Sequence, residues 1–373
     1  MGCDFKWLCL ERRPVLKSVI LSVVMRRLLI LLLGLLLAGG LFAQKHKKKP
    51  DEDPRPQILE VLPDTPEAVV AESGRLSFQV SPLSDKGLLS QQVRDALKAL
   101  ARLNHGATIV KLRAFVAGSG DLRRIKDIVA EEFTERKQTL PAVSTIQVGA
   151  LPLPGAQVVI EAISSEKKVV NPNGLAFFSA AASANAVNSA ATLQSAMHNW
   201  RVKAQDVLRV TCFLSSLDDV QAERAAVSAA FPAAATNFLQ MQRLGLERQA
   251  LCEGVARWTG IPVADASPRD VALINSAAKI VLTATQLVFR DQDSDFRLAY
   301  QRLAKALLPL GATFKDVFWT GTYALTRTDG SKLDNIQWEF LDRTSRPPHT
   351  ALQIEGLPST DATAAVELMA VGR

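Results

Sequence analysis

The sequence predicts an α+β fold built from three successive units, each with the element order β-β-α-β-α-β-β. Amphipathic helices and apolar strands follow one another in the same order three times, at a spacing of about 100 residues, and such a period is typical of repeated structural units. In units one and two, the strand after the first helix alternates between apolar and polar residues. Such alternation predicts a sheet with one face against helices and the other against a more polar surface.

Residues 1–43 predict a targeting segment. Arg26 and Arg27 precede an apolar run of about fifteen residues, and small residues and Ala43 follow it, which is the order of a secretory signal. Met25 is an alternative start of the chain. Removal of the segment near Ala43 would export the protein to the periplasm or the extracellular space. The alternative is an uncleaved membrane anchor, and only this segment is expected to contact a membrane.

Residues 44–56 are charged and proline-rich and have no apolar period, so they predict a linker. The three units that follow are assigned to residues 57–165, 166–262 and 263–373. Each unit opens with a pair of short strands, expected within 74–84, 174–183 and 278–289.

Apolar residues spaced by three and four predict the first helix of each unit, within residues 88–106, 190–202 and 296–312. The next strand is expected at 109–116, 207–214 and 316–325. One apolar face of this strand is expected to carry Val110, Leu112, Ala114 and Val116, matched in unit two by Leu208, Val210, Cys212 and Leu214. The second helices are expected within 119–133, 216–231 and 328–341, and the closing strand pairs within 140–164, 236–257 and 346–371.

Charge and cysteine content exclude several classes of function. The net charge is +7, but residues 1–43 hold six Lys/Arg and two Asp/Glu, so the remaining chain carries only +3. A body so close to neutral is not typical of a protein that binds nucleic acid. Cys212 and Cys252 are the cysteines that follow the targeting segment. Their apolar surroundings favour two buried thiols, and a single disulfide in an oxidising compartment is the alternative.

Several segments resemble the YjgF/RidA family across roughly residues 57–373. They are HGATIVKLRAFV, PAVSTIQVGALP and VVIEAI in unit one, AQDVLRVTCFLSSLDDV in unit two, and LLPLGATFKDVFWTGTYAL and RPPHTALQIEGLP in unit three. The resemblance implies a chorismate-mutase-like fold, a homotrimer with sheets around a central β-barrel, and ligand clefts between subunits. Three units in one chain therefore predict a monomeric pseudotrimer. The alternative is a string of independent domains that pair with other chains.

The resemblance also implies a chemistry, the hydrolysis of a 2-keto acid's enamine or imine. Members with this activity carry an arginine just after Pro-Ala, which binds the substrate carboxylate, and a glutamate that holds a water two residues before a second, more structural glutamate. The arginine position falls on Val143, on Thr236 or Ala235, and on His349. The water-holding position falls on Val159, Leu251 and Ala365. The second glutamate is kept as Glu161, Glu253 and Glu367.

No unit keeps the arginine or the water-holding glutamate, so no catalytic residue is predicted. His349 is the substitute expected to bind a small carboxylate when its imidazole is protonated. Thr285 and Gln286 match the family strand that lines the same cleft, so they are predicted ligand-binding residues. The four histidines are scattered and no phosphate-binding loop is present; we therefore expect no metal and no cofactor.

The function that follows is an exported, catalytically degenerate YjgF/RidA-like pseudotrimer that binds a small molecule or a partner at clefts between its units. One alternative is an enzyme, either an enamine or imine deaminase with a rebuilt site or a ribonuclease-like relative. Another is a purely structural protein of the cell envelope. The missing arginine and glutamate argue against the usual deaminase, and the near-neutral body argues against RNA.

Overall fold

The computed structural model describes residues 61–179, 182–243, 248–261, 270–344 and 346–373. Val61–Arg373 form one compact unit. The predicted targeting segment, residues 1–43, and the predicted linker, residues 44–56, lie outside the described residues. Among the helices that are described, none is both long enough and apolar enough to cross a membrane.

The first sheet has the strand order β2-β5-β3-β4. In chain order its elements are β2 (Leu76–Val80), α2 (Leu89–Leu103), β3 (Thr108–Ala117), α3 (Arg124–Glu135), β4 (Ala142–Val148) and β5 (Val158–Ser165). β3 and β4 are parallel, since α3 connects them, and the other pairs are antiparallel. Both helices pack on one face of this sheet through a core that includes Leu97, Leu112 and Ile128.

The second sheet repeats this arrangement with the order β11-β6-β10-β8-β9, and the short β7 pairs with β10. Its elements are β6 (Leu175–Phe178), β7 (Ala182–Ser183), α4 (Ala186–Asn199), β8 (Val207–Leu214), α5 (Val220–Ala230), β9 (Ala235–Gln240), β10 (Ala250–Arg257) and β11 (Val271–Ile274). Again the pair joined by a helix, β8 and β9, is parallel. The helices cover one face of the sheet through residues such as Leu193 and Val227.

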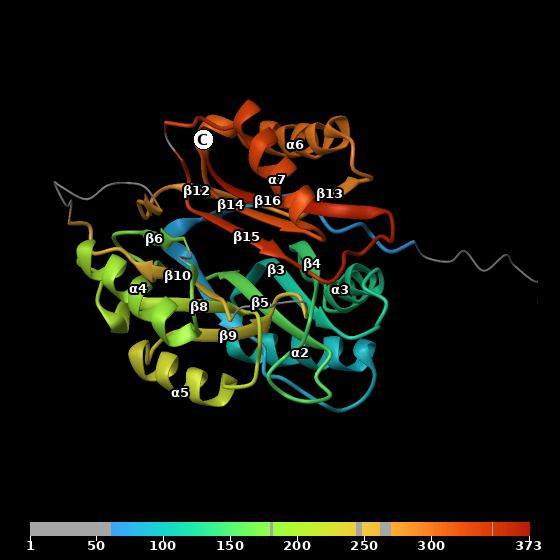
Figure 1. Cartoon of the computed structure of the whole chain (residues 1–373). Helices are drawn as coiled ribbons and strands as arrows, with labels where there is room; N and C mark the ends of the chain where they lie inside the picture. The colour runs from blue at the N-terminus through green and yellow to red at the C-terminus, as the bar shows by residue number, and fades with distance from the viewer. Residues whose placement is uncertain (1–60, 180–181, 244–247, 262–269, 345) are drawn as a thin grey trace, which may run out of the picture. The chain divides into compact units, whose positions relative to one another are not determined.

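The third sheet has the order β1-β12-β16-β14-β15, and β13 pairs with β16. Its elements are β1 (Ala68–Glu72), β12 (Lys279–Thr283), β13 (Gln286–Phe289), α6 (Asp293–Leu307), β14 (Val317–Ala324), α7 (Arg327–Ile336), β15 (His349–Gln353) and β16 (Ala362–Gly372). β14 and β15 are parallel. Tyr300, Leu303 and Leu333 join α6 and α7 to the sheet. The result is a mixed α+β fold with several sheets, each carrying its own helix pair (Figure 1).

Two strands pair with a sheet other than the one that is next to them in the chain. β1 precedes the first sheet but pairs with β12 of the third, and β11 precedes the third sheet but pairs with β6 of the second. These exchanges link the sheets through backbone hydrogen bonds. Pairing between strands so far apart in the chain has no local sequence signal, so the sequence did not predict it.

The faces without helices pack against one another. Phe115, Phe213 and Tyr323, one from each sheet, share a single buried apolar cluster. The strands remain in three separate sheets, however, and in the described part of the chain they do not close into the central β-barrel that the sequence predicted. The sheets contact one another through side chains packed between their faces and do not form one continuous hydrogen-bonded sheet.

The predicted apolar faces of β3 and β8 need a correction at their first residue. Leu112, Ala114 and Val116 face the helices as expected, but Val110 and Leu208 belong to a cluster between the sheets. The pairing register shifts between Ile109 and Lys111. A β-bulge of this kind reverses which side chains face the helices, because strand side chains alternate.

Cys212 and Cys252 form a disulfide, so the interpretation of two free thiols was wrong. The two residues lie directly opposite each other on β8 and β10, with 4.1 Å between their Cα atoms. Sequence alternation placed both in apolar strands, but only the antiparallel register brings the sulfur atoms together.

Candidate functional site

Three glutamates, one on a central strand of each sheet, come together where the sheets face one another. Glu161 on β5, Glu253 on β10 and Glu367 on β16 are all buried. They are the residues matched to the second, more structural glutamate of the resembling family. In their own sheets they lie opposite, in that order, Arg113, Thr211 and Gly321.

Each of these glutamates accepts a hydrogen bond from the parallel strand of a different sheet. The donor–acceptor pairs are Ser144–Glu367, Asn237–Glu161 at 2.9 Å and Thr350–Glu253 at 2.6 Å. The first sheet therefore bonds to the third, the second to the first and the third to the second. The three donors occupy equivalent positions on β4, β9 and β15, so one pattern of contacts runs in a closed cycle.

Arg113 on β3 lies among all three carboxylates. Its Nη1 is 2.7 Å from Oε1 of Glu253 and 3.3 Å from Oε2 of Glu161. Its Nε is 3.3 Å from Oε1 of Glu367. The guanidinium is buried, and a buried charge of this kind is retained only where opposite charges and hydrogen bonds compensate its lost hydration.

Two further cations balance the charge of this glutamate cluster. Nζ of Lys111 lies 2.7 Å from Glu367, and Nη2 of Arg209 lies 3.2 Å from Glu253, so three buried cations match three buried carboxylates. Burial alone would raise the pKa of Glu367, but Lys111 and Arg113 outweigh burial and lower it to about 2. All members of the cluster are buried, and they lie where the three sheets face one another.

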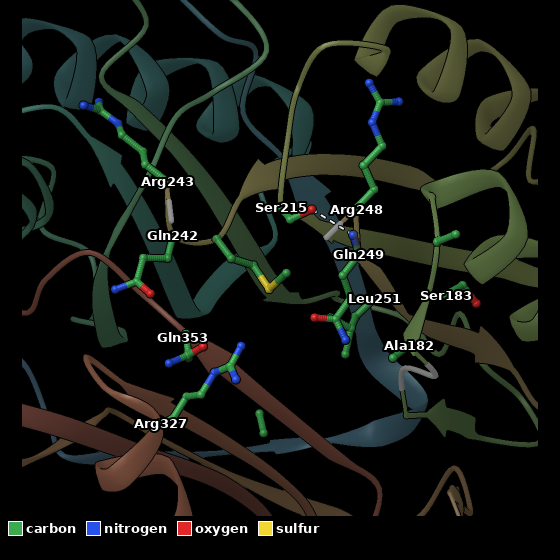
Figure 2. Close-up of a pocket in the computed structure, with 13 residues that line it drawn as sticks. Ala182, Ser183, Ser215, Gln242, Arg243, Arg248, Gln249, Leu251, Arg327 and Gln353 are labelled. Atoms are coloured by element: carbon green, nitrogen blue, oxygen red, sulfur yellow. Dashed lines mark hydrogen bonds between the residues drawn. The ribbon is translucent and has the colours of Figure 1, made fainter. Parts of the chain in front are cut away.

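A cleft of about 1390 Å³ opens between the second and third sheets (Figure 2). Ser183 on β7 and Leu251 on β10 line it from the second sheet, and Arg327 on α7 with Ala351 and Gln353 on β15 lines it from the third. Leu251 is the residue matched to the water-holding glutamate of the resembling family. That position therefore faces the cleft but carries an alkyl group, which can neither accept a proton nor hold a water.

The arginines that line the cleft differ in whether their guanidinium groups have a hydrogen-bond or ion-pair partner. Nε of Arg243 donates to the carbonyl oxygen of Gly149 at 2.9 Å, and Arg248 forms an ion pair with Asp219; both side chains point away from the middle of the cleft (Figure 2). Arg327 points into it (Figure 2). Among the described residues it has no hydrogen-bond or ion-pair partner.

A second cleft, of about 480 Å³, lies between α3 and β13, and the segment of residues 62–67 forms part of its lining. Thr285 also lines this cleft. Gln286 is buried, and its side-chain amide donates to the carboxylate of Glu67. The backbone N–H of Ala284 donates to the carbonyl oxygen of Glu67 at 2.7 Å. Glu67 of this segment therefore bonds to the region of Thr285 and Gln286 that the sequence assigned to ligand binding.

His349 begins β15 and lines neither of these clefts. Its Nδ1 lies 2.7 Å from the hydroxyl of Thr320, its Nε2 lies 3.3 Å from that of Thr322, and Asp334 is 3.9 Å from Nε2. Burial, with a smaller effect of nearby Arg346, lowers the pKa of His349 to about 4. The imidazole is therefore neutral near pH 7, whereas the sequence interpretation required its protonated form.

His349→Gln should remove a pH dependence of stability. The folded-state pKa of about 4 lies below the ordinary value of 6.5, so between these values the unfolded chain binds more protons. The contribution of His349 to the free energy of unfolding is therefore fully present above pH 6.5. It decreases by on the order of 3 kcal/mol as the pH falls toward 4. Urea unfolding midpoints at pH 7 and pH 4.5 should therefore differ more in the wild type than in His349→Gln. The exposed His198 supplies a control, because His198→Gln should leave the difference unchanged.

Sequence reasoning did not identify Arg327. The hydroxyl of Thr326 accepts a hydrogen bond from the backbone N–H of Asp329 at 3.1 Å, so these two residues mark the start of α7 with Arg327 as its first residue. This signal was available in the sequence, but nothing local indicated that the side chain enters a cleft. In the part of the chain that the structure describes, no group of three or more His, Cys, Asp or Glu residues could hold a metal ion.

Part of the chain is similar to a known protein family. Residues 65–166, which contain the first sheet and its helices, match the family model described as Endoribonuclease L-PSP. This is the family whose members the sequence resembled under the name YjgF/RidA. No curated protein matches the chain.

Solved structures that resemble parts of the chain include members of the same family. A YjgF-family protein from Mycobacterium tuberculosis has 21% identity and a TM-score of 0.24, and the match covers 25% of this chain and 83% of that one. A YjgF-family protein from Neisseria meningitidis has 12% identity and a TM-score of 0.24, covering 29% and 91%. A protein from Entamoeba histolytica described as a candidate endoribonuclease L-PSP has 17% identity and a TM-score of 0.23, covering 26% and 86%. At these values the structural matches carry no argument about function.

Proposed function

We propose that the three sheets are three divergent units of the endoribonuclease L-PSP family, whose model matches residues 65–166 of this chain. They are joined in one exported chain that binds a ligand or partner and does not hydrolyse imines. The binding site is the cleft between the second and third sheets. Leu251 carries the proposal, because it lines this cleft at the position where the resembling catalysts have a carboxylate.

The cycle of glutamate contacts supports a three-fold arrangement of the units. A contact from each unit to a different one, repeated in one direction, closes after three steps, as in a cyclic trimer. Ser144, Asn237 and Thr350 make equivalent contacts of this kind. The exchange of β1 and β11 between sheets argues in addition against three independent domains.

The disulfide supports the export of the chain. Cys212 and Cys252 are bridged, and such bridges persist mainly in oxidising compartments outside the cytosol. A buried cross-strand bridge between β8 and β10 fits a protein that folds after secretion. The targeting segment, residues 1–43, supports the same proposal from the sequence.

The experiment combines a mass measurement with an assay. We expect light scattering to give the mass of one chain, and we expect no release of ammonia from 2-aminoacrylate above the uncatalysed rate. The physical reason for the second result is that Leu251 cannot hold a water and that neutral His349 cannot replace the arginine that binds the carboxylate. A relative that keeps both the arginine and the glutamate provides the positive control.

Each readout tests a different part of the proposal. A mass of three chains would contradict the single-chain ring. Turnover of 2-aminoacrylate at a rate like that of the control would contradict a non-hydrolytic site.

A further inference from the structure

One edge of β15 has backbone groups that pair with no strand among the described residues. The carbonyl of Pro348 accepts from the N–H of Thr320 at 3.0 Å, and the N–H of Ile354 donates to the carbonyl of Ala324 at 3.0 Å, so both groups point toward β14. Successive residues of a parallel strand direct their backbone groups to opposite edges. Those of Ala351 and Gln353 therefore point away from β14, where β15 is the last strand in the order of its sheet.

This edge lies in the cleft between the second and third sheets. Ala351 and Gln353 both line the cleft, and Ala351 is exposed. A strand edge with free N–H and C=O groups is a template for another extended chain. Peptides bind to many domains in this way, with backbone hydrogen bonds supplying affinity and side-chain contacts supplying specificity.

The side chains around the edge favour an acidic peptide. Arg327 points into the cleft without a partner among the described residues, and the described lining residues include no acidic side chain. They include no aromatic side chain either, whereas sites for single-stranded nucleic acid stack bases on aromatic rings. The volume of about 1390 Å³ is larger than the roughly 300–1,000 Å³ typical of small-molecule pockets.

We propose that the cleft accepts an extended peptide as an additional strand along β15, with an acidic side chain of the peptide bound by Arg327. This inference rests on the proposed function of the same cleft and specifies its partner. A carboxylate beside the guanidinium of Arg327 forms charge-assisted hydrogen bonds. The free backbone groups of Ala351 and Gln353 bond to the peptide main chain.

The test measures fluorescence anisotropy of the full chain with fluorescein-labelled Thr-Glu-Val-Glu-Thr. We expect saturable binding that weakens as salt is added, because exposed ionic contacts are screened. The peptide with lysine in place of glutamate should bind much more weakly. The same acidic peptide with N-methylated backbone amides should also bind weakly, because it keeps the carboxylates but loses the donors that a strand contact needs. Glutarate and oligouridylate serve as competitors and should displace little of the probe.

Two variants test the two contacts separately. Arg327→Gln should weaken binding about tenfold, the usual effect of losing a hydrogen bond to a charged group. Arg124→Gln is its matched control, because Arg124 is the first residue of α3 as Arg327 is of α7, is exposed and lines neither cleft. Ala351→Pro removes the N–H that points away from β14, so no bond to β14 is lost, and proline is tolerated at such edge positions. It should weaken binding several-fold while the thermal midpoint stays near the wild-type value.

Several results would overturn the proposal: no binding of the acidic peptide, equal binding of the N-methylated peptide, or complete displacement by glutarate or oligouridylate. Equal affinity of Arg327→Gln and Arg124→Gln would overturn the role of Arg327. The imine assay is independent of these readouts. Hydrolysis without peptide binding refutes both proposals, and hydrolysis with peptide binding refutes the non-hydrolytic function alone.

Discussion

Replacing Arg113 with leucine is expected to lower the free energy of unfolding by about 3–5 kcal/mol, because it leaves buried carboxylates without their shared counter-charge. Nη1 of Arg113 lies 2.7 Å from Glu253, and the same guanidinium also lies near Glu161 and Glu367. Urea unfolding followed by tryptophan fluorescence measures the loss. Arg297 provides the control, since it pairs with Glu339 at the surface at 2.8 Å. Arg297→Leu should cost less than about 1 kcal/mol.

A double variant separates charge imbalance from lost packing. Arg113→Leu alone leaves three carboxylates and two cations in the cluster. Adding Glu253→Leu restores equal numbers, so the double variant should be more stable than Arg113→Leu. If the two changes destabilise the protein additively, or if Arg113→Leu costs no more than Arg297→Leu, the ion pairs do not hold the sheets together.

Removing the disulfide should lower the free energy of unfolding by about 4 kcal/mol. The reason is that a bridge between residues 40 apart reduces the conformational entropy of the unfolded chain. The measurement is the urea midpoint of the double variant Cys212→Ala and Cys252→Ala against the wild type. Reductant should lower the wild-type midpoint toward that of the variant and leave the variant unchanged. A wild-type midpoint that reductant does not move at all, even in partly unfolding urea, would contradict a stabilising bridge.

The helices and most strands were predictable from the sequence because their signals are local. Leu97 and Leu100 on α2 and Leu112 and Val116 on β3 follow the helical and strand periods, and all of them are buried where those periods predict. Val110 was misplaced because a bulge of one residue leaves no periodic signal. The exchanged strands β1 and β11 were also out of reach, since their partners lie far away in the chain.

The predicted absence of catalytic residues stays a prediction. The sequence placed alkyl groups at the water-holding positions, and Leu251 does face a cleft. The choice of His349 as a substitute anchor depended on its charge, which its surroundings set: burial against Thr320 and Thr322 lowers its pKa. Thr285 and Gln286 lie in a region where residues 62–67 pack, and a sequence pattern cannot indicate which distant segment fills a cleft.

By itself, the sequence determined the types and order of the helices and of most strands and the apolar side of each helix, and it predicted the loss of the arginine and glutamate that the resembling catalysts use. These follow from residue identity and spacing within a few turns of chain. The tertiary structure alone decided that Glu161, Glu253 and Glu367 meet around Arg113, that Cys212 and Cys252 are bridged, and that Arg327 points into the cleft lined by β15. Such contacts join residues from distant parts of the chain, so they depend on register and on the packing of one sheet against another.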